Sequence, residues 1–204
     1  MSVPSGRTIT NARLRRTLLA IQDVMGQSGL VTILRQAGLP RYVSALPVAD
    51  SGPALRATEY ATLMQAIENY YGRGARGTLM RIGYASFLRL VKERRAQAAL
   101  YRVWFRLLPL AARRWQLLAW LARELAGSDG QVTLHRDDQH LNLVDHTSDP
   151  TAGRQRDQAI CWMTVGEIQE ALKWGTGQEY EVTELACRAK GDAACRFEVG
   201  DPIG

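Results

Sequence analysis

Apolar side chains recur at helical spacing through the first 127 residues of the chain. The pattern predicts a helix over residues 12–26, capped by Asn11 and ended by Gly26. Further stretches share this spacing, and the helices they predict cover residues 29–38, 59–72, 74–97 and 98–125. This part of the sequence therefore predicts a set of packed helices over residues 11–127.

Proline and glycine interrupt the helical pattern at a few positions. The segment 39–53 contains three prolines and is typical of a loop, after which Thr58 is a suitable cap for the next helix. Gly77 and Gly83 weaken the helix in which they lie, and they allow a neighbouring helix to pack closely. Pro109 fits either a first helical turn or a kink, so its stretch forms one kinked helix or two.

Beyond residue 130 the apolar positions alternate, which is the pattern of β-strands. The predicted elements are a hairpin at 131–146, a helix at 160–175 ended by Gly175, and a hairpin at 178–200 around Lys190, Gly191 and Asp192. We therefore expect an α+β fold, in which an antiparallel sheet from two hairpins packs against the N-terminal helices. The two hairpins have to pair with each other to complete that sheet.

We interpret residues 1–204 as one domain, with a helical part at 11–127 and a hairpin, helix, hairpin part at 131–200. No apolar run approaches the roughly 20 residues of a membrane span, and residues 1–10 lack the apolar core of a secretory signal. An odd count of three cysteines also argues against a secreted disulfide framework. We expect a cytoplasmic protein without a transmembrane segment.

The formal net charge of +6 is concentrated in the middle of the chain. Residues 81–123 contain ten Lys or Arg against Glu93 alone. These arginines can bind the carboxylates of a tetrapyrrole, contact anionic lipid, or simply solvate an outer helix face, which is the simplest interpretation. Nucleic acid is not an expected partner, because no helix-turn-helix, zinc-finger or base-stacking motif is present.

Two cysteines and a glutamate gather in the stretch ELACRAKGDAACRFEVG, residues 184–200. In a regular strand Glu184 and Cys187 point to opposite faces, so a shared site requires an irregularity near Ala186. Cys187 and Cys195 flank the hairpin turn, and Cys161 is available as a third thiolate. Such a set suits a closed tetrahedral Zn²⁺ site of structural type, although buried free cysteines explain the spacing equally simply.

This stretch, together with AICWMTVGEIQEAL upstream, resembles the C-terminal signature of the 4-vinyl reductase domain family. The family includes sensory domains of activators that respond to phenolic aromatics and a bacteriochlorophyll-pathway protein, and its fold is similar to TRAPP tethering subunits. By resemblance to the zinc-bearing sensory members, the zinc ligands are Cys161, Glu184, Cys187 and Cys195. The resemblance also implies a homodimer and an apolar pocket between helices and sheet.

The ligand of that pocket is expected to be a hydrophobic small molecule, either an aromatic compound or a tetrapyrrole. The candidate contact residues are Trp104 and Trp115 in the leucine-rich helical segment and His140 in the first hairpin, although core packing and solvent exposure are the simpler roles. We expect a sensor or carrier rather than an enzyme, because no nucleotide-binding or nucleophile motif is present. The alternatives are an enzyme or accessory protein in (bacterio)chlorophyll vinyl-group reduction, and a TRAPP-like interaction subunit.

Overall fold

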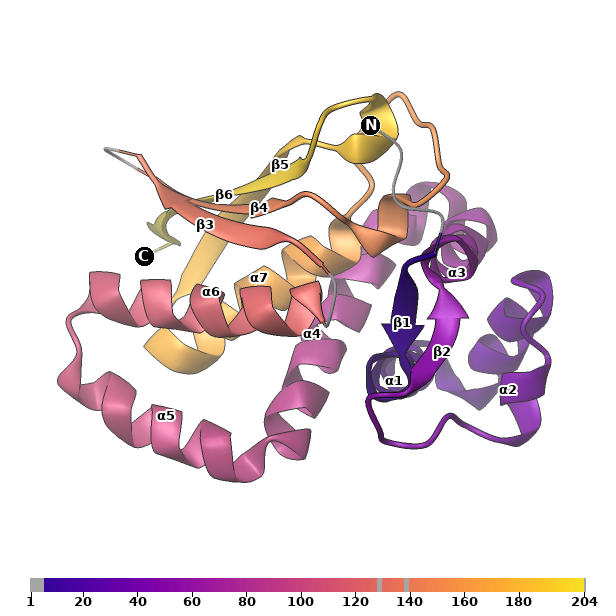
Figure 1. Ribbon diagram of the computed structural model, residues 1–204, viewed down its shortest axis with the longest axis horizontal. Helices are drawn as coiled ribbons and strands as arrows, with labels where there is room; N and C mark the ends of the chain where they lie inside the picture. Colours follow the sequence, from indigo (N-terminus) through magenta and orange to yellow (C-terminus); the bar gives the residue numbers. More distant parts are fainter. Residues whose placement is uncertain (1–5, 128–129, 138–139, 204) are drawn as a thin grey trace.

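A computed structural model describes residues 6–127, 130–137 and 140–203 of the chain (Figure 1). Its N-terminal half contains β1 (Thr8–Thr10), α1 (Asn11–Gln36), α2 (Arg41–Ser44), β2 (Pro53–Arg56), α3 (Ala57–Tyr71), α4 (Ala75–Glu93), α5 (Arg95–Leu107) and α6 (Leu110–Ala126). Its C-terminal half contains β3 (Val132–Arg136), β4 (Leu141–Asp145), α7 (Trp162–Thr176), β5 (Glu179–Ala186) and β6 (Cys195–Ile203). Helices come first and the larger sheet comes last, as the sequence predicts.

The first two predicted helices form the two arms of α1, which breaks at Gly26. Gly26 has a φ of 72°, a left-handed conformation that glycine adopts without steric cost. The N-terminal cap is Thr10 and not Asn11, because the Thr10 hydroxyl accepts a hydrogen bond from the Arg13 backbone N–H at 3.3 Å. The predicted boundary was therefore wrong by one residue.

The segment predicted to be a loop holds more structure than its prolines suggest. It contains the short helix α2, and its end leads into β2, which pairs antiparallel with β1. The helix α3 begins at Ala57, where the Glu59 carboxylate accepts a hydrogen bond from the Arg56 N–H at 2.9 Å. Thr58 therefore lies inside the first turn and does not cap the helix.

The helices α4 and α7 pack backbone against backbone. A Cβ atom at Gly83 would lie 2.1 Å from the Met163 carbonyl oxygen, and one at Gly166 would lie 2.2 Å from that of Met80. The close packing predicted for Gly83 is thus confirmed, whereas a Cβ at Gly77 would meet nothing within 4 Å. This contact joins the N-terminal helices to the C-terminal part of the chain.

The two predicted hairpins pair into one antiparallel sheet with the strand order β3-β4-β6-β5. The helices α6 and α7 cover one face of this sheet (Figure 1). The helix α7 runs past the predicted stop at Gly175 and ends before Gly177, whose φ is 80°. Gly175 instead lies against Leu117 of α6, where a Cβ atom would come within 2.3 Å of that side chain. The expected α+β architecture is confirmed.

Two apolar cores share the helices α4 and α7. Leu79 and Ile82 of α4 belong to the core between the N-terminal helices, whereas Phe87 and Leu90 belong to the core beneath the larger sheet. Among the described helices, α1 has the length and hydropathy of a membrane span, which differs from the expectation of no such run. Its residues Leu14, Leu18 and Ile21 are buried in the N-terminal core.

Candidate metal centre

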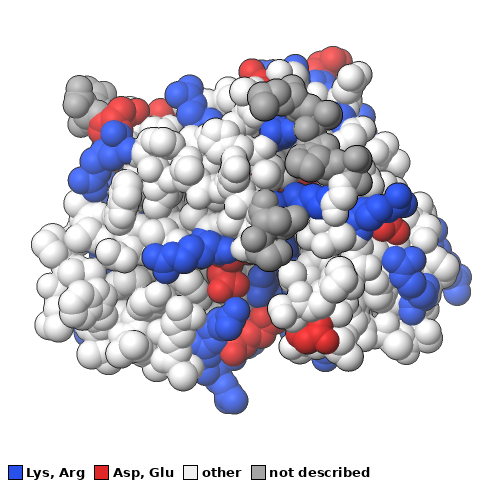
Figure 2. Space-filling model, in the orientation of Figure 1, with Lys and Arg blue, Asp and Glu red and all other residues white. Residues whose placement is uncertain are grey.

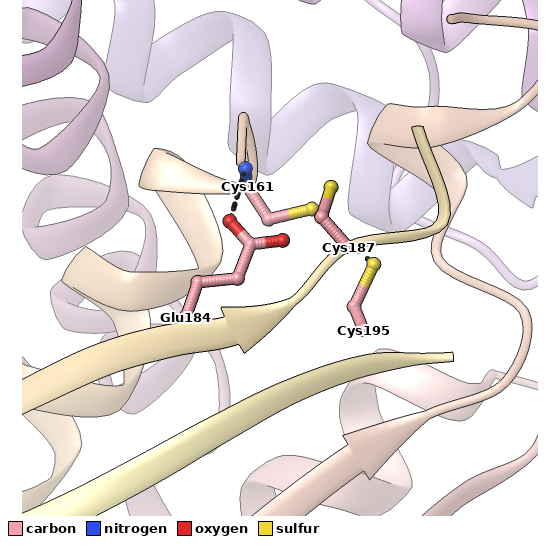
Figure 3. Close-up of side chains that lie close together, drawn as sticks. All are labelled: Cys161, Glu184, Cys187 and Cys195. Atoms are coloured by element: carbon pink, nitrogen blue, oxygen red, sulfur yellow. Dashed lines mark hydrogen bonds between the residues drawn. The ribbon is translucent and has the colours of Figure 1, made fainter. Parts of the chain in front are cut away.

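The three cysteines and Glu184 meet where α7 and the last hairpin approach each other (Figure 3). Cys161 directly precedes α7, Glu184 lies near the end of β5, Cys187 follows that strand, and Cys195 begins β6. The pairing of β5 with β6 shifts register between Glu184 and Ala186. This is the irregularity that the sequence required, and it allows Glu184 and Cys187 to point to the same site.

The distances within the cluster suit a tetrahedral metal ion. The four candidate ligand atoms all lie within 4.8 Å of one another, and the Sγ atoms of Cys161 and Cys195 are 3.6 Å apart. A disulfide would require about 2.05 Å, so the cysteines are free thiols. Two sulfurs that each lie about 2.3 Å from one tetrahedral zinc ion are separated by roughly 3.8 Å.

Glu184 has one satisfied oxygen and one unsatisfied oxygen. Its Oε2 accepts a hydrogen bond from the Cys161 backbone N–H at 2.8 Å, whereas its buried Oε1 has no hydrogen-bond partner among the described residues. Burial, followed by the charge of Cys187, raises the pKa of Glu184 to about 8. A cation beside Oε1 would remove this penalty, so the carboxylate fits a metal ligand better than a bystander.

The thiols share their protons within a fully buried cluster. Hydrogen bonding with Cys161 lowers the pKa of Cys187, and the same contact raises the pKa of Cys161. Protein groups alone therefore favour one thiolate and disfavour the others. Metal binding deprotonates every thiol ligand, which makes binding depend on pH and couples it to folding.

The structure also shows three polar neighbours that the sequence analysis did not include. Ser148 Oγ lies 3.5 Å from the Cys161 sulfur, and the Arg188 backbone N–H donates to the Cys195 sulfur at 3.3 Å. The Asp192 carboxylate accepts a hydrogen bond from the Cys187 N–H at 2.8 Å. The turn position of Asp192 was a usable signal, since Asp often caps nearby backbone N–H groups. No sequence pattern pointed to Ser148.

The three candidate ligand contacts do not meet in one cavity of the described structure. Trp115 lines an open hollow of about 540 Å³, to which Pro109 and Arg136 also contribute. Trp104 projects from α5 with 53 % of its surface exposed. His140 lies in the hairpin, 3.8 Å from the Glu198 carboxylate.

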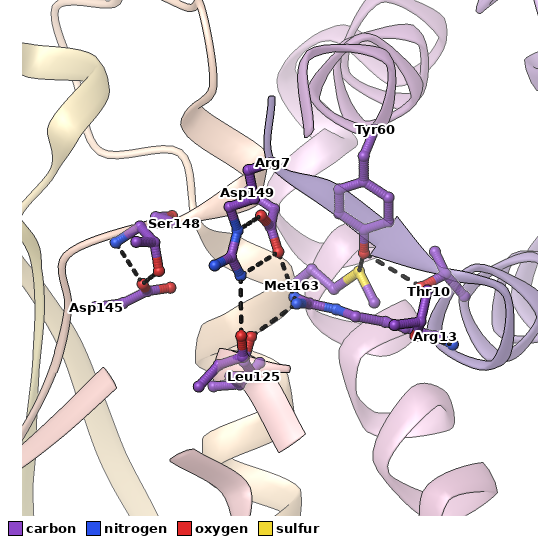
Figure 4. Close-up of polar contacts among 12 residues, drawn as sticks. Arg7, Thr10, Arg13, Tyr60, Leu125, Asp145, Ser148, Asp149 and Met163 are labelled. Carbon is purple, nitrogen blue, oxygen red and sulfur yellow. Dashed lines mark hydrogen bonds and ion pairs between the residues drawn. The ribbon is translucent and has the colours of Figure 1, made fainter. Parts of the chain in front are cut away.

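A second hollow, of about 640 Å³, lies beside β1 and the end of α6 and has a charged lining. Below it, Arg7 Nε and Arg13 Nη1 each approach the buried Asp149 carboxylate to 2.6 Å (Figure 4). Arg13 also donates to the Leu125 carbonyl at 2.9 Å. This network connects the start of the chain to the segment before α7, and it differs from the apolar pocket expected from the sequence.

Comparison with known families identifies the segment that carries the cluster. Residues 146–201 match the 4-vinyl reductase domain. The predicted resemblance to this family is thus confirmed for the matched segment, which contains all four candidate metal ligands. A comparison with curated proteins gives no match.

Solved structures with a similar fold extend over almost the whole chain. The unliganded Fe(II) H-NOX protein from K. algicida aligns with a TM-score of 0.61 and 12% identity, covering 96% of this chain and 97% of that one. The H-NOX protein from S. oneidensis in the Fe(II)NO ligation state gives 0.58 and 10%, covering 93% and 99%. At such low identity the likeness shows the fold alone, so the 4-vinyl reductase segment lies within an H-NOX-like α+β fold.

Proposed function

We propose that this protein is a small-molecule-binding sensor or carrier domain whose C-terminal hairpin is held by a structural zinc ion. The observation that supports the zinc best is the buried Cys161, Glu184, Cys187 and Cys195 cluster, with ligand atoms within 4.8 Å of one another. Four protein ligands fill a tetrahedral shell, which leaves no position for a reactive water. The ion would therefore fix the start of α7 to the hairpin and would not activate a substrate.

The sensor or carrier function is supported by the fold and by the family segment. The H-NOX structures of the same fold are described in terms of NO ligation and heme, and both are properties of those proteins. For this chain we propose a flat aromatic ligand, bound at the hollow beside Trp115. The indole can stack on a ring, and Arg136 on the same hollow can pair with a ligand carboxylate.

Metal analysis of the purified, untagged protein tests the zinc proposal directly. We expect about one zinc per chain by elemental analysis, and native mass spectrometry should retain the ion with the folded protein. Protein that is folded by circular dichroism but contains no metal would contradict the proposal.

Titration with protoporphyrin IX, an aromatic dicarboxylate, tests the ligand proposal. We expect quenching of tryptophan fluorescence and a shifted porphyrin absorbance band. The variants Trp115→Ala and Arg136→Gln should weaken binding about tenfold while the zinc content stays unchanged. Equal binding by wild type and both variants would place the ligand elsewhere.

A further inference from the structure

The helix α5 presents an apolar face to solvent. Leu100, Val103, Trp104 and Leu107 are 68%, 65%, 53% and 76% exposed, and their spacing places them along one side of the helix. The surface over α5, at the lower left of Figure 2, is mostly free of charged atoms. Single exposed apolar residues are common on proteins, but four on one short helix form a patch that points to an interaction.

The opposite side of α5 already packs against the protein. Ala98 and Phe105 are buried, and the Tyr101 ring stacks on Phe105 with centroids 5.3 Å apart. The exposed apolar face is therefore an additional face of the helix and not a misplaced core face. It remains available while α5 stays attached to the domain.

An arginine row borders this apolar face. Arg95, Arg102 and Arg106 are exposed and lie seven and four residues apart, so they share one side of the helix. The whole segment 94–123 contains seven arginines and no acidic residue. A partner that covers the apolar face therefore meets positive charge at its edge, which calls for an anionic surface.

We propose that α5 docks on the surface of an anionic lipid bilayer. The helix would lie in the plane of the membrane, with Leu100, Val103, Trp104 and Leu107 at the boundary between headgroups and acyl chains. Its arginines would contact lipid phosphates, and the tryptophan occupies the depth that aromatic rings prefer. The inference depends only on α5 and stands independently of the zinc site and of the ligand.

A second copy of the chain fits this face less well. Two copies related by a two-fold axis through α5 would bring together helices that carry arginines and no carboxylate to pair with them. From Leu100 to Leu107 the patch extends only about 10 Å along the helix. That length is short for the roughly 800 Å² per partner that a stable interface buries.

Vesicle co-sedimentation of the full-length protein tests the proposal. We expect binding to vesicles of phosphatidylcholine with 30% phosphatidylglycerol, little binding to pure phosphatidylcholine, and loss of binding at high salt. Tryptophan emission should shift to the blue with anionic vesicles, and the variant Trp104→Phe should lack most of that shift. Absence of binding to anionic vesicles would overturn the proposal.

Matched variants separate the two contributions of α5. Leu100→Ser with Leu107→Ser should weaken binding at least tenfold because buried apolar area is lost. Arg95→Gln with Arg106→Gln should weaken it about 25-fold, since each arginine near an anionic surface contributes roughly fivefold. Val48→Ser, at a residue 61% exposed outside α5, should bind as wild type.

Two further measurements keep the outcomes distinct. Circular dichroism and zinc content of each variant show whether the fold and the metal site are intact, so a failure of the zinc proposal would appear there and not in the sedimentation. Native mass spectrometry without lipid reports the oligomeric state. A stable dimer that Leu100→Ser with Leu107→Ser dissociates would assign this face to a second copy and would overturn the membrane proposal.

Discussion

Cys195 contacts its surroundings in two ways that differ from those of an ordinary core residue. Its sulfur lies 3.6 Å from that of Cys161 and accepts a hydrogen bond from the Arg188 N–H at 3.3 Å. A hydrogen bond from backbone N–H to sulfur stabilises the charged form of a thiolate. The side chain is thus placed to work as an anion within the cluster.

The substitution Cys195→Ala should abolish stoichiometric zinc binding and lower the melting temperature by about 10 °C or more, on the order of the loss of a structural metal. Elemental analysis and thermal melts of both proteins provide the measurement. Ser148→Ala is the matched control, because its hydroxyl contacts the cluster at 3.5 Å without being a proposed ligand. If Cys195→Ala retains zinc, the assignment of ligands is wrong.

Glu167 predicts a pH dependence of stability that is separate from the cluster. Burial raises its pKa above the usual value of 4.5, although Ser86 donates a hydrogen bond to its Oε1 at 2.7 Å. The folded state therefore retains this proton longer than the unfolded state, so its contribution is present at low pH and is lost as pH rises through the folded-state pKa.

The substitution Glu167→Gln removes this titration and keeps a hydrogen-bond acceptor for Ser86. Relative to wild type, the variant should gain stability as pH increases from about 4 to 8, which urea unfolding at several pH values measures. Glu59→Gln is the opposite control: a hydrogen bond from the Arg56 backbone lowers the pKa of Glu59, so this variant should lose stability as pH increases. Parallel curves for wild type and Glu167→Gln would exclude the proposed titration.

At the level of elements, the crossing of α4 and α7 depends on two glycines. Gly83→Ala should cost about 3 kcal/mol, because its Cβ would lie 2.1 Å from a backbone carbonyl that cannot move independently. Gly77→Ala on the same helix should stabilise by roughly 0.5–1 kcal/mol, since its Cβ meets nothing. Denaturant unfolding of the pair measures both changes, and equal effects would show that the crossing is not tightly packed.

Periodicity predicted the long helices and both hairpins because each spans enough residues to show its apolar face. It did not predict β1 and β2, which are three and four residues long and include Pro53. Helix ends were less predictable for a local reason. Gly175 and Gly177 are equivalent in the sequence, but only Gly177 has the left-handed φ that ends the helix.

The candidate metal ligands were predictable because one short motif carries three of them. The hairpin turn sets the distance between Cys187 and Cys195, and the register shift near Ala186 followed from the need to align Glu184. The ligand contacts were harder to predict, since an aromatic residue on an amphipathic helix has the same pattern whether it faces the core, a cavity or solvent. Trp104, Trp115 and Trp120 follow one pattern and have three different environments.

At the scale of the whole molecule, the two cores are joined through α4 and α7. Trp162 packs against both cores, and the Arg7 and Arg13 contacts with Asp149 add a polar connection between the ends of the chain. We therefore propose that residues 1–204 fold as one cooperative domain, as the sequence analysis expected.

Removal of the metal by a chelator should accordingly lower the stability of the entire protein. We expect tryptophan fluorescence and far-ultraviolet circular dichroism to follow the same unfolding curve, and that single curve should shift to lower temperature with the chelator. The tryptophans lie in or beside the C-terminal core, whereas α1 and α3 contribute much of the helical signal. Separate transitions would indicate two independent units.

The position of the four candidate ligands along the chain sets an order of events during synthesis. Apart from Met163, the N-terminal core is built from residues 9–82, whereas the ligands occupy positions 161 to 195. At the usual pace of translation the ribosome needs on the order of ten seconds to pass from the first set to the second. The nascent helices therefore have to associate first without the ion, and the metal seals a molecule whose N-terminal half has already formed.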